Sequence, residues 1–272
     1  MQEYVRGQPH PSLAAHVVGY TGYREHSAVP LRRLQAPSGS CPLILGFGGA
    51  IQLEGPGGTS VPTAFLAGMH AAAVITQFVG GQCGIQVDLT PLGVFALLGR
   101  PMFELTNRIV PLDDLESADL AVLPTRLAED PNWPARFARV DGVLRRRLER
   151  SPVRPNPEVA WAWGRLTRAA GAIEVGELAA RTGWSRRHLL TRFREQIGLA
   201  PKTAARVLRF RRAAGLLVPV DPSGAPPTGG STRGLADVAV TCGYADHSHL
   251  VRDFRALAGC TPSQYVEQWR SG

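Results

Sequence analysis

The sequence has little of what metal and redox sites require. Only four of its 272 residues are cysteines, and none of them forms a Cys-x-x-Cys pair, so the clustered ligands of a zinc site are missing. The histidines of the first hundred residues stand apart and include no His-x-His pair. We therefore expect no metal ion and no cofactor, and we interpret the cysteines as buried, reduced thiols.

The sequence also lacks the signatures of common enzymes and of membrane proteins. It contains no Gly-x-Ser-x-Gly motif, no phosphate-binding loop and no dinucleotide-binding glycine motif. No apolar run approaches the ~18 residues that a transmembrane helix needs. The first residues have no signal-peptide pattern. These absences predict a cytoplasmic protein that is not an enzyme.

Lysine is nearly absent, since Lys202 is the only one, and arginine carries the positive charge. The thirteen basic and thirteen acidic residues of 1–153 cancel, so the whole formal net charge of +8 lies in residues 154–272. The base composition of the gene would explain arginine in place of lysine, but it would not explain this asymmetry. A neutral half followed by a basic half is typical of a protein whose second half binds nucleic acid.

The basic half contains one sequence pattern twice. The segment EVGELAARTGWSRRHLLTRFREQIGLAPK begins at Glu174, and it aligns with GLADVAVTCGYADHSHLVRDFRALAGCTPSQ, which begins at Gly234. Gly183 aligns with Gly243 at an offset of 60, and one extra residue near Asp246 then changes the offset to 61. Each copy predicts a helix, a turn and a second helix.

The physical chemistry of the first copy supports this prediction. Apolar residues around Leu178 recur at helical spacing, and Gly183 follows them where a left-handed helix end favours glycine. Ser185 then stands at an N-cap position. Leu189 and Phe193 lie four residues apart on the inner face of the second helix. A helix-turn-helix unit of this kind can place its second helix in the major groove of DNA.

The paired motifs resemble the DNA-binding domain of the AraC/XylS family of bacterial transcription regulators. The tails FREQIGLAPK and DFRALAGCTPSQYV carry this likeness, which covers about residues 155–270. The resemblance implies two helix-turn-helix units, at about 174–198 and 235–259, that read two successive major-groove segments on one face of the DNA. It also implies a long joining helix at about 201–218.

The outer positions of the two second helices are the candidate DNA-binding residues. They are Arg186, Arg187, Leu190, Thr191 and Arg194 in the first unit and His247, Ser248, Val251, Arg252 and Arg255 in the second. By the family's motif, base reading falls on Arg187, Leu190, Thr191, His247, Ser248, Val251 and Arg252. Arginine can bond two acceptors of guanine, whereas leucine and valine can make only apolar contacts.

The first part of the chain has a different pattern. Short apolar runs rich in β-branched residues alternate with turn clusters over residues 1–90, which predicts the strands of a small barrel or sandwich. The following segment, 90–115, places Pro91 at a helix start and Gly99 at its end. This segment resembles the cupin-like N-terminal domain found in actinobacterial regulators. Candidate residues of an effector pocket are the strand aromatics Tyr20, Tyr23, Phe47 and Phe65. A barrel filled by its own side chains is the alternative.

Three further segments matter for the organisation of the chain. Residues 130–151 predict a helix whose apolar stripe either forms a dimer interface or packs on its own barrel. Residues 151–157 contain three prolines and predict an extended linker. Residues 218–234 are rich in proline, glycine and serine. They depart from the family's pattern and predict a surface loop.

The sequence therefore predicts an α+β fold. A β-rich, cupin-like barrel occupies residues 1–150, a linker residues 151–157, and an all-α DNA-binding domain residues 158–272. The predicted function is a sequence-specific transcription regulator that binds double-stranded promoter or operator DNA. A small-molecule effector, RNA polymerase and a second copy of the chain are further candidate partners. The alternatives are a cupin-type or DNA-repair enzyme docked on DNA, and an architectural DNA binder without an effector.

Overall fold

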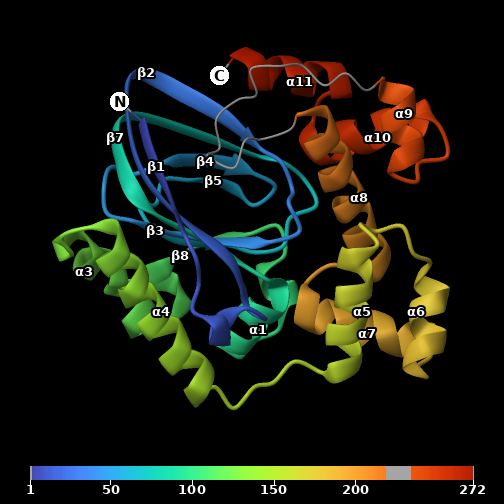
Figure 1. Ribbon diagram of the computed structural model, residues 1–272, viewed down its shortest axis with the longest axis horizontal. Coiled ribbons are helices and arrows are strands. Elements are labelled where there is room, and N and C mark those ends of the chain that lie inside the picture. The colour runs from blue at the N-terminus through green and yellow to red at the C-terminus, as the bar shows by residue number, and fades with distance from the viewer. Residues whose placement is uncertain (1, 219–233, 272) are drawn as a thin grey trace.

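The computed structural model describes residues 2–218 and 234–271. The first part of the chain forms an antiparallel sheet of eight strands (Figure 1). The strands are β1 (Gln2–Gly7), β2 (Val17–Gln35), β3 (Cys41–Gly46), β4 (Gln52–Gly55), β5 (Gly58–Ser60), β6 (Phe65–Ala67), β7 (Val74–Leu89) and β8 (Ile109–Pro111). They pair in the order β1-β2-β7-β3-β6-β8, and β4 joins β7 to β5.

The sheet is open, where the sequence predicted a closed barrel. Strands β1 and β8 end the pairing order, and among the described residues no ladder joins them into a ring. Strands β6 and β8 have three residues each, which gives them too few backbone groups to continue the sheet around. The long strands β2 and β7 pair over most of their length, and a bulge between Ser27 and Leu31 bends the pair.

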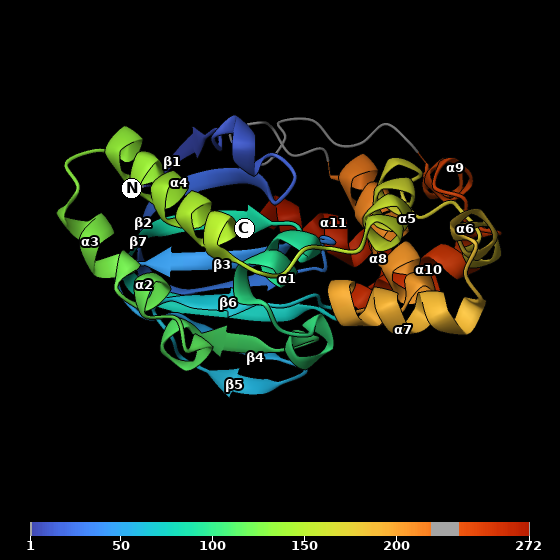
Figure 2. The same ribbon diagram turned by 90° about the horizontal axis from the view of Figure 1, so that it is seen from below.

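Helices cover one face of this sheet, with α1, α2 and α4 in front of it in Figure 2. The segments are η1 (Pro11–Leu13), α1 (Pro91–Leu98), η2 (Met102–Leu105), η3 (Leu112–Leu115), α2 (Ala118–Ala121), α3 (Leu123–Glu129) and α4 (Trp133–Arg150). Helix α1 begins where Thr90 Oγ1 accepts a 2.9 Å hydrogen bond from the amide of Gly93. It ends at Gly99, whose φ of 67° is left-handed, so both predicted ends of this helix are confirmed.

The apolar stripe of α4 packs on its own domain. Val140 and Leu144 are fully buried, and the ring of Phe137 stacks on that of Tyr20 with centroids 5.8 Å apart. Gly7 makes this approach possible, because a Cβ there would lie 2.8 Å from the Phe137 ring. Of the two alternatives for residues 130–151, packing within the domain is therefore the one observed.

The second part of the chain is helical. Its helices are α5 (Pro157–Arg168), α6 (Val175–Thr182), α7 (Arg186–Ile197), α8 (Pro201–Leu217), α9 (Leu235–Thr241), α10 (His247–Ala258) and α11 (Pro262–Ser271). Figure 1 shows α5, α6 and α7 at one end of α8 and α9, α10 and α11 at its other end. The predicted joining helix is thus confirmed as α8. The predicted surface loop at 218–234 falls almost wholly on residues 219–233, outside the described residues.

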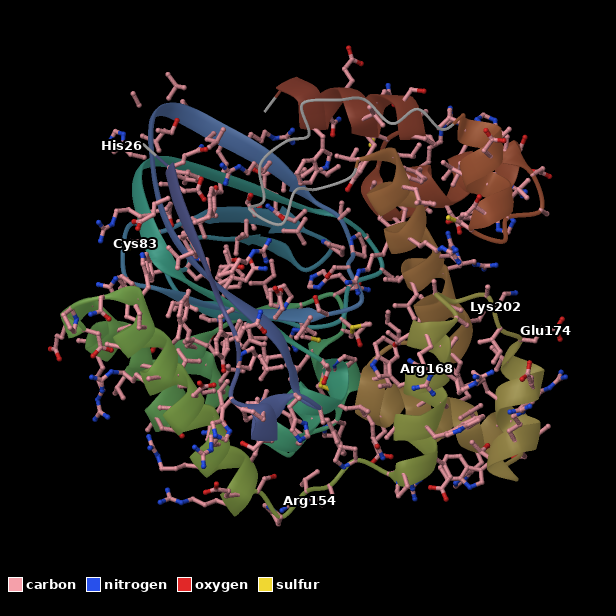
Figure 3. The ribbon with its side chains drawn as sticks, in the orientation of Figure 1. His26, Cys83, Arg154, Arg168, Glu174 and Lys202 are labelled. Atoms are coloured by element: carbon pink, nitrogen blue, oxygen red, sulfur yellow. The ribbon has the colours of Figure 1, made fainter. Side chains whose placement is uncertain are left out.

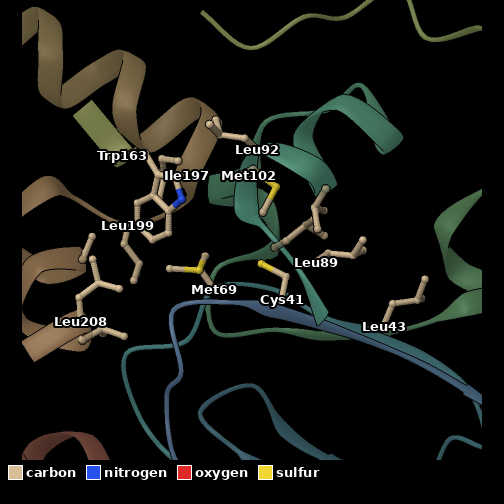
Figure 4. Close-up of a cluster of buried hydrophobic side chains, with 14 of the residues drawn as sticks. Cys41, Leu43, Met69, Leu89, Leu92, Met102, Trp163, Ile197, Leu199 and Leu208 are labelled. Carbon is tan, nitrogen blue, oxygen red and sulfur yellow. The ribbon is translucent and has the colours of Figure 1, made fainter. Parts of the chain in front are cut away.

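The two parts share one hydrophobic core. Figure 4 shows Trp163, Ile197 and Leu199 of the helical part facing Met69 and Met102 of the sheet part. Beside them, Thr106 Oγ1 donates a 2.9 Å hydrogen bond to the carbonyl of Gly198, at the end of α7. The first helix-turn-helix unit is therefore packed against the N-terminal domain.

The predicted linker runs outside this core. Residues 151–156 form neither helix nor strand, and Figure 3 shows Arg154 at the edge of the molecule between α4 and α5. Ser151 fixes the start of the segment, because its Oγ donates a 2.6 Å hydrogen bond to the carbonyl of Ala96. Among the described helices, none is both long enough and apolar enough to cross a bilayer.

Candidate DNA-binding surface and ligand cavity

The first helix-turn-helix unit is held by the contacts that its sequence indicates. Helix α6 ends at Gly183, whose φ of 70° lies in the left-handed region. Ser185 caps α7, since its Oγ accepts a 3.2 Å hydrogen bond from the amide of His188. Leu189 and Phe193 are fully buried and anchor the inner face of α7. The outer face of α7 therefore points to solvent.

The second unit repeats this construction with different residues. Gly243 takes the left-handed conformation with a φ of 72°, and Asp246 caps α10 by accepting a 2.6 Å hydrogen bond from the amide of His249. Leu250 and Phe254 are fully buried. The shift of offset near Asp246 thus coincides with the turn, where one added residue does not disturb either helix.

The ten candidate DNA-binding residues lie on the outer faces of the two second helices. All five on α7 are exposed: Arg186, Arg187, Leu190, Thr191 and Arg194. On α10, His247, Ser248, Arg252 and Arg255 are exposed and Val251 is partly buried. Such surfaces can meet base edges and phosphates together.

The side chains of α7 are not equally free to reach a base. Arg187 and Arg194 form no ion pair within the described part of the chain. Arg186 lies back over α6, because a Cβ on Gly176 would be 2.9 Å from its Nη2 atom. Thr191 Oγ1 donates a 3.1 Å hydrogen bond to the carbonyl of Arg187. Among the arginines of this face, Arg187 and Arg194 are therefore free to reach outward.

The histidines at equivalent places in the two units are packing residues in the structure. The ring of His188 meets Trp184 edge-on with centroids 4.5 Å apart, and the ring of His249 meets Tyr244 in the same way at 5.2 Å. Each histidine therefore braces the start of its second helix against the turn.

One pair of side chains at the second unit was missed by sequence reasoning. Arg206 of α8 donates a 2.8 Å hydrogen bond from Nε to Oδ1 of Asp253 on α10, and Asp253 is 3% exposed. The second oxygen of Asp253 and the hydroxyl of Tyr244 are buried without a hydrogen-bond partner. Asp253 stands on the inner face of α10 beside Phe254, and that position is the only signal of its burial in the sequence.

A cavity of about 700 Å³ lies between the sheet and the helical part of the chain. The sheet contributes residues from β1, β2, β3, β4, β6, β7 and β8 to its lining. The opposite wall is formed by Trp163 and Thr167 of α5 and by Leu208 and Arg211 of α8. A molecule in this cavity would touch both parts of the protein.

Charged and polar groups from β2, from β7 and from the segment between β6 and β7 line the cavity. Glu25 is 7% exposed and pairs with Arg33 through contacts of 2.7 Å and 3.1 Å. Burial lowers the pKa of His70, whose Nδ1 lies 2.7 Å from the carbonyl of Gly68 and whose Nε2 is buried without a partner. Burial also raises the pKa of Asp88, and the hydrogen bond from Gln86 opposes that shift. These groups can orient a polar ligand, while Leu53, Phe65 and Val74 give the cavity an apolar side.

Two of the four predicted pocket residues line this cavity. They are Tyr23 and Phe65, whereas Tyr20 and Phe47 lie elsewhere. Tyr20 is three residues from Tyr23 on β2, so it points to the opposite face of the strand, where its hydroxyl donates a 2.8 Å hydrogen bond to Asp141. Phe47 lies beneath the guanidinium of Arg136 at 5.1 Å. The same alternation places Glu25 beside Tyr23, and this pattern could have identified Glu25 as a lining residue.

A metal centre is not visible in the part of the chain that the structure describes, where no group of three or more histidine, cysteine, aspartate or glutamate side chains could hold an ion. All four cysteines are free, and burial raises the pKa of the Cys41 thiol.

Residues 178–268 match the family model described as a helix-turn-helix domain. Over nearly its whole length the chain has the fold of ToxT from Vibrio cholerae O395, with a TM-score of 0.51, 11% identity, and coverage of 93% of this chain and 98% of that one. A ToxT structure bound to (E)-4-(8-methylnaphthalen-1-yl)but-3-enoic acid gives a TM-score of 0.52 at 9% identity, covering 92% of this chain and 98% of that one. The DNA-binding domain of the transcriptional factor AdpA, in complex with a target DNA, matches at 27% identity with a TM-score of 0.36, covering 43% of this chain and 96% of that one. No curated protein matches the chain.

Proposed function

We propose, for a chain whose residues 178–268 form a helix-turn-helix domain of the AraC type, that the protein is a sequence-specific transcription regulator reading two adjacent major-groove segments. The observation that carries this proposal is the pair of capped, outward-facing helices α7 and α10 at the two ends of α8. The whole net charge of the chain lies in the same part, which supports contact with a polyanion.

Under this proposal the two recognition helices, α7 and α10, contact bases through different residues. In the first unit Arg187 reads guanine with two hydrogen bonds and Leu190 contacts an apolar base edge such as a thymine methyl. Thr191 contributes less, since its hydroxyl already bonds within α7. In the second unit the readers are His247, Ser248, Val251 and Arg252. The remaining arginines, Arg186, Arg194 and Arg255, contact phosphates and set the register.

The experiment that tests this proposal is a selection of bound duplexes from a random library by the full chain. We expect an enriched site with two segments about one helical turn apart. The binding constant of that site should fall steeply with rising salt, because phosphate contacts release counterions. Salt-dependent binding without an enriched sequence would instead favour the architectural DNA binder, and no binding at all would contradict both.

We further propose that the cavity between the two parts binds a small effector. Its volume of about 700 Å³ is that of a typical ligand site. Its walls come from the sheet and from α5 and α8, so a ligand would couple the N-terminal domain to the helix that joins the two units. That a ToxT structure holds a small carboxylic acid gives the same fold a precedent for ligand binding.

A thermal-shift screen of the full chain against metabolites tests the effector. A ligand at a hundredfold excess over its Kd raises the free energy of unfolding by about 2.7 kcal/mol. A matched variant is Ala67→Leu, which fills the cavity from β6 and should abolish the shift. An effector site in this cavity is excluded if no metabolite raises the melting temperature, or if Ala67→Leu leaves the shift intact.

We also propose how the chain is divided into domains. The open sheet would be a cupin-like domain over residues 1–150, followed by the linker 151–157 and the DNA-binding domain 158–272. The long paired strands β2 and β7, which are bent at a bulge and both line the cavity, support that assignment. A regulator of this kind would act on the bacterial chromosome in the cytoplasm, with RNA polymerase and a second copy as further partners. The helix-turn-helix match favours this reading over a DNA-docked enzyme.

A further inference from the structure

A second concave site lies on the N-terminal domain, away from the cavity just described. It has a volume of about 580 Å³ and lies between α3, α4, the end of α1 and the start of the segment that leads to α5. Five arginines line it: Arg126, Arg139, Arg146, Arg147 and Arg150. We propose that this arginine groove binds a nucleoside polyphosphate.

Two of the arginines are held in place by the protein. Arg139 donates from Nε and Nη2 to the two oxygens of Asp130, both at 2.6 Å. Arg147 donates from Nη2 to the carbonyl of Leu97 at 3.0 Å and from Nη1 to Asp119. Their guanidinium groups are therefore fixed at the wall of the groove before any ligand arrives, which lowers the entropic cost of binding.

The other three arginines carry charge that no carboxylate neutralises. Arg126, Arg146 and Arg150 form no ion pair among the described residues, and the one acidic side chain in the lining is Asp119, which Arg147 engages. This excess is local, because the basic and acidic residues of 1–153 cancel. A multiply charged anion would offset the mutual repulsion of these guanidinium groups, and guanidinium groups match phosphate oxygens in geometry.

The floor of the groove differs from its walls. Leu97, Leu123 and Val143 are buried at its base, and Leu98 is partly exposed beside them. An apolar floor under a basic wall suits a ligand with a flat ring at one end and phosphates at the other. Inorganic polyphosphate would use the wall and leave the floor empty.

The position of the groove separates it from the proposed DNA-binding surface. In Figures 1 and 2 helix α4 lies over the sheet domain, whereas α10 lies in the helical part beside it. A concave site of this size admits a small molecule, whereas duplex DNA needs an open basic track. The lining also includes Ser151, Pro152 and Val153, so a bound ligand would hold the linker against α1 and α4.

Calorimetric titration of the full chain with ATP and with inorganic tripolyphosphate tests the inference. The variant Arg126→Gln/Arg146→Gln/Arg150→Gln removes the unpaired charges, and we expect its Kd for ATP to rise at least about tenfold. All three positions are exposed, so the variant should keep the melting temperature of the wild type. The matched control, Arg187→Gln/Arg252→Gln, removes two cations from α7 and α10 and should leave the Kd for ATP unchanged.

The outcomes separate the possible readings. ATP binding tighter than tripolyphosphate binding supports a ring on the apolar floor, and equal affinities would overturn the nucleoside part of the proposal. Loss of ATP binding in the control variant alone would place the anion on the DNA-binding surface and overturn the groove. Unchanged ATP binding in the groove variant would also overturn the groove. None of these results depends on whether the protein regulates transcription.

Discussion

Arg206 on α8 and Asp253 on α10 form the link between the joining helix and the second recognition helix. The Nε atom of Arg206 lies 2.8 Å from Oδ1 of a carboxylate that is 3% exposed. Beside this pair the guanidinium of Arg209 lies over the ring of Tyr244 at 5.7 Å. Because α9, α10 and α11 are attached to the rest of the protein mainly through α8, these contacts set the orientation of the second unit.

The substitution Asp253→Asn should therefore affect both stability and base preference. It preserves the volume of the side chain but leaves Arg206 without its charged partner. We expect the free energy of unfolding to fall by about 1–3 kcal/mol, measured by urea denaturation. We also expect weaker discrimination at the DNA segment that α10 reads, with preference at the α7 segment retained.

An exposed ion pair provides the control for this experiment. Arg192 and Glu195 on α7 lie 3.0 Å apart, and both are substantially exposed. Glu195→Gln should cost only about 0.2–1 kcal/mol. If Asp253→Asn costs no more than Glu195→Gln and leaves base preference at both segments unchanged, the buried pair does not position α10.

The helix-turn-helix units could be read from the sequence because their determinants are local. Gly183 and Gly243 follow the end of a helix in the left-handed conformation, Ser185 and Asp246 cap the next one, and apolar residues four apart anchor it. Each of these signals lies within a few residues of the structure it specifies. The joining helix α8 was predictable for the same reason, since Pro201 opens it.

The contacts between distant parts of the chain could not be read in this way. Nothing near Leu199 in sequence indicates that it packs against the sheet domain, and a charged residue such as Asp253 is usually exposed. Only two of the four aromatic residues predicted for the pocket line the cavity, because the sequence of a strand does not reveal which of its two faces meets the pocket. The prediction of a closed barrel failed for a similar reason, because the pairing of short strands such as β6 and β8 depends on tertiary contacts.

The shared core predicts that the DNA-binding part is less stable alone than in the full chain. Leu199 is 4% exposed in the protein and faces Met69 across the boundary (Figure 4). Leu199→Ala should cost about 2–5 kcal/mol in the full chain. In a fragment that starts at Pro155 the same change should cost less, because the fragment lacks Met69 and the other side chains of the sheet part that cover this leucine.

Leu189→Ala is the matched comparison. Leu189 is fully buried within the first unit, so its loss should destabilise the full chain and the fragment alike. Urea denaturation of the four variants and of the unsubstituted full chain and fragment gives both differences. Equal costs for Leu199→Ala in the two contexts would mean that the N-terminal domain adds nothing to the stability of the first unit.

The buried His70 should make stability depend on pH. Burial lowers its pKa below the ordinary value of 6.5, and the bond to the Gly68 carbonyl only partly opposes this shift. The unfolded chain therefore takes up this proton at a higher pH than the folded chain, and the free energy of unfolding falls as pH drops below about 6.5. His70→Gln keeps a donor for the Gly68 carbonyl but cannot take up the proton.

The comparison is made at two pH values. At about pH 7.5 the imidazole is neutral in both states, so any difference between wild type and His70→Gln reports lost packing alone. At about pH 5.5 the wild type should lose more stability than the variant. His16, whose pKa is also lowered by burial, remains in both proteins and cancels in the difference. Parallel pH profiles would show that His70 is not protonated differently on unfolding.

The last prediction separates base reading from phosphate contact on α7. Arg187 has no ion-pair partner in the described residues and faces outward, so Arg187→Ala should cost about 1–3 kcal/mol at one position of the first DNA segment and relax its base preference. Arg194 lies seven residues further along the helix and is also exposed. Arg194→Ala should weaken binding to all sequences alike and reduce the salt dependence by about one counterion. Affinities for the enriched site and for its single-base variants, each at several salt concentrations, distinguish the two. If Arg187→Ala instead lowers every affinity by the same factor, Arg187 contacts phosphate and another residue reads that base.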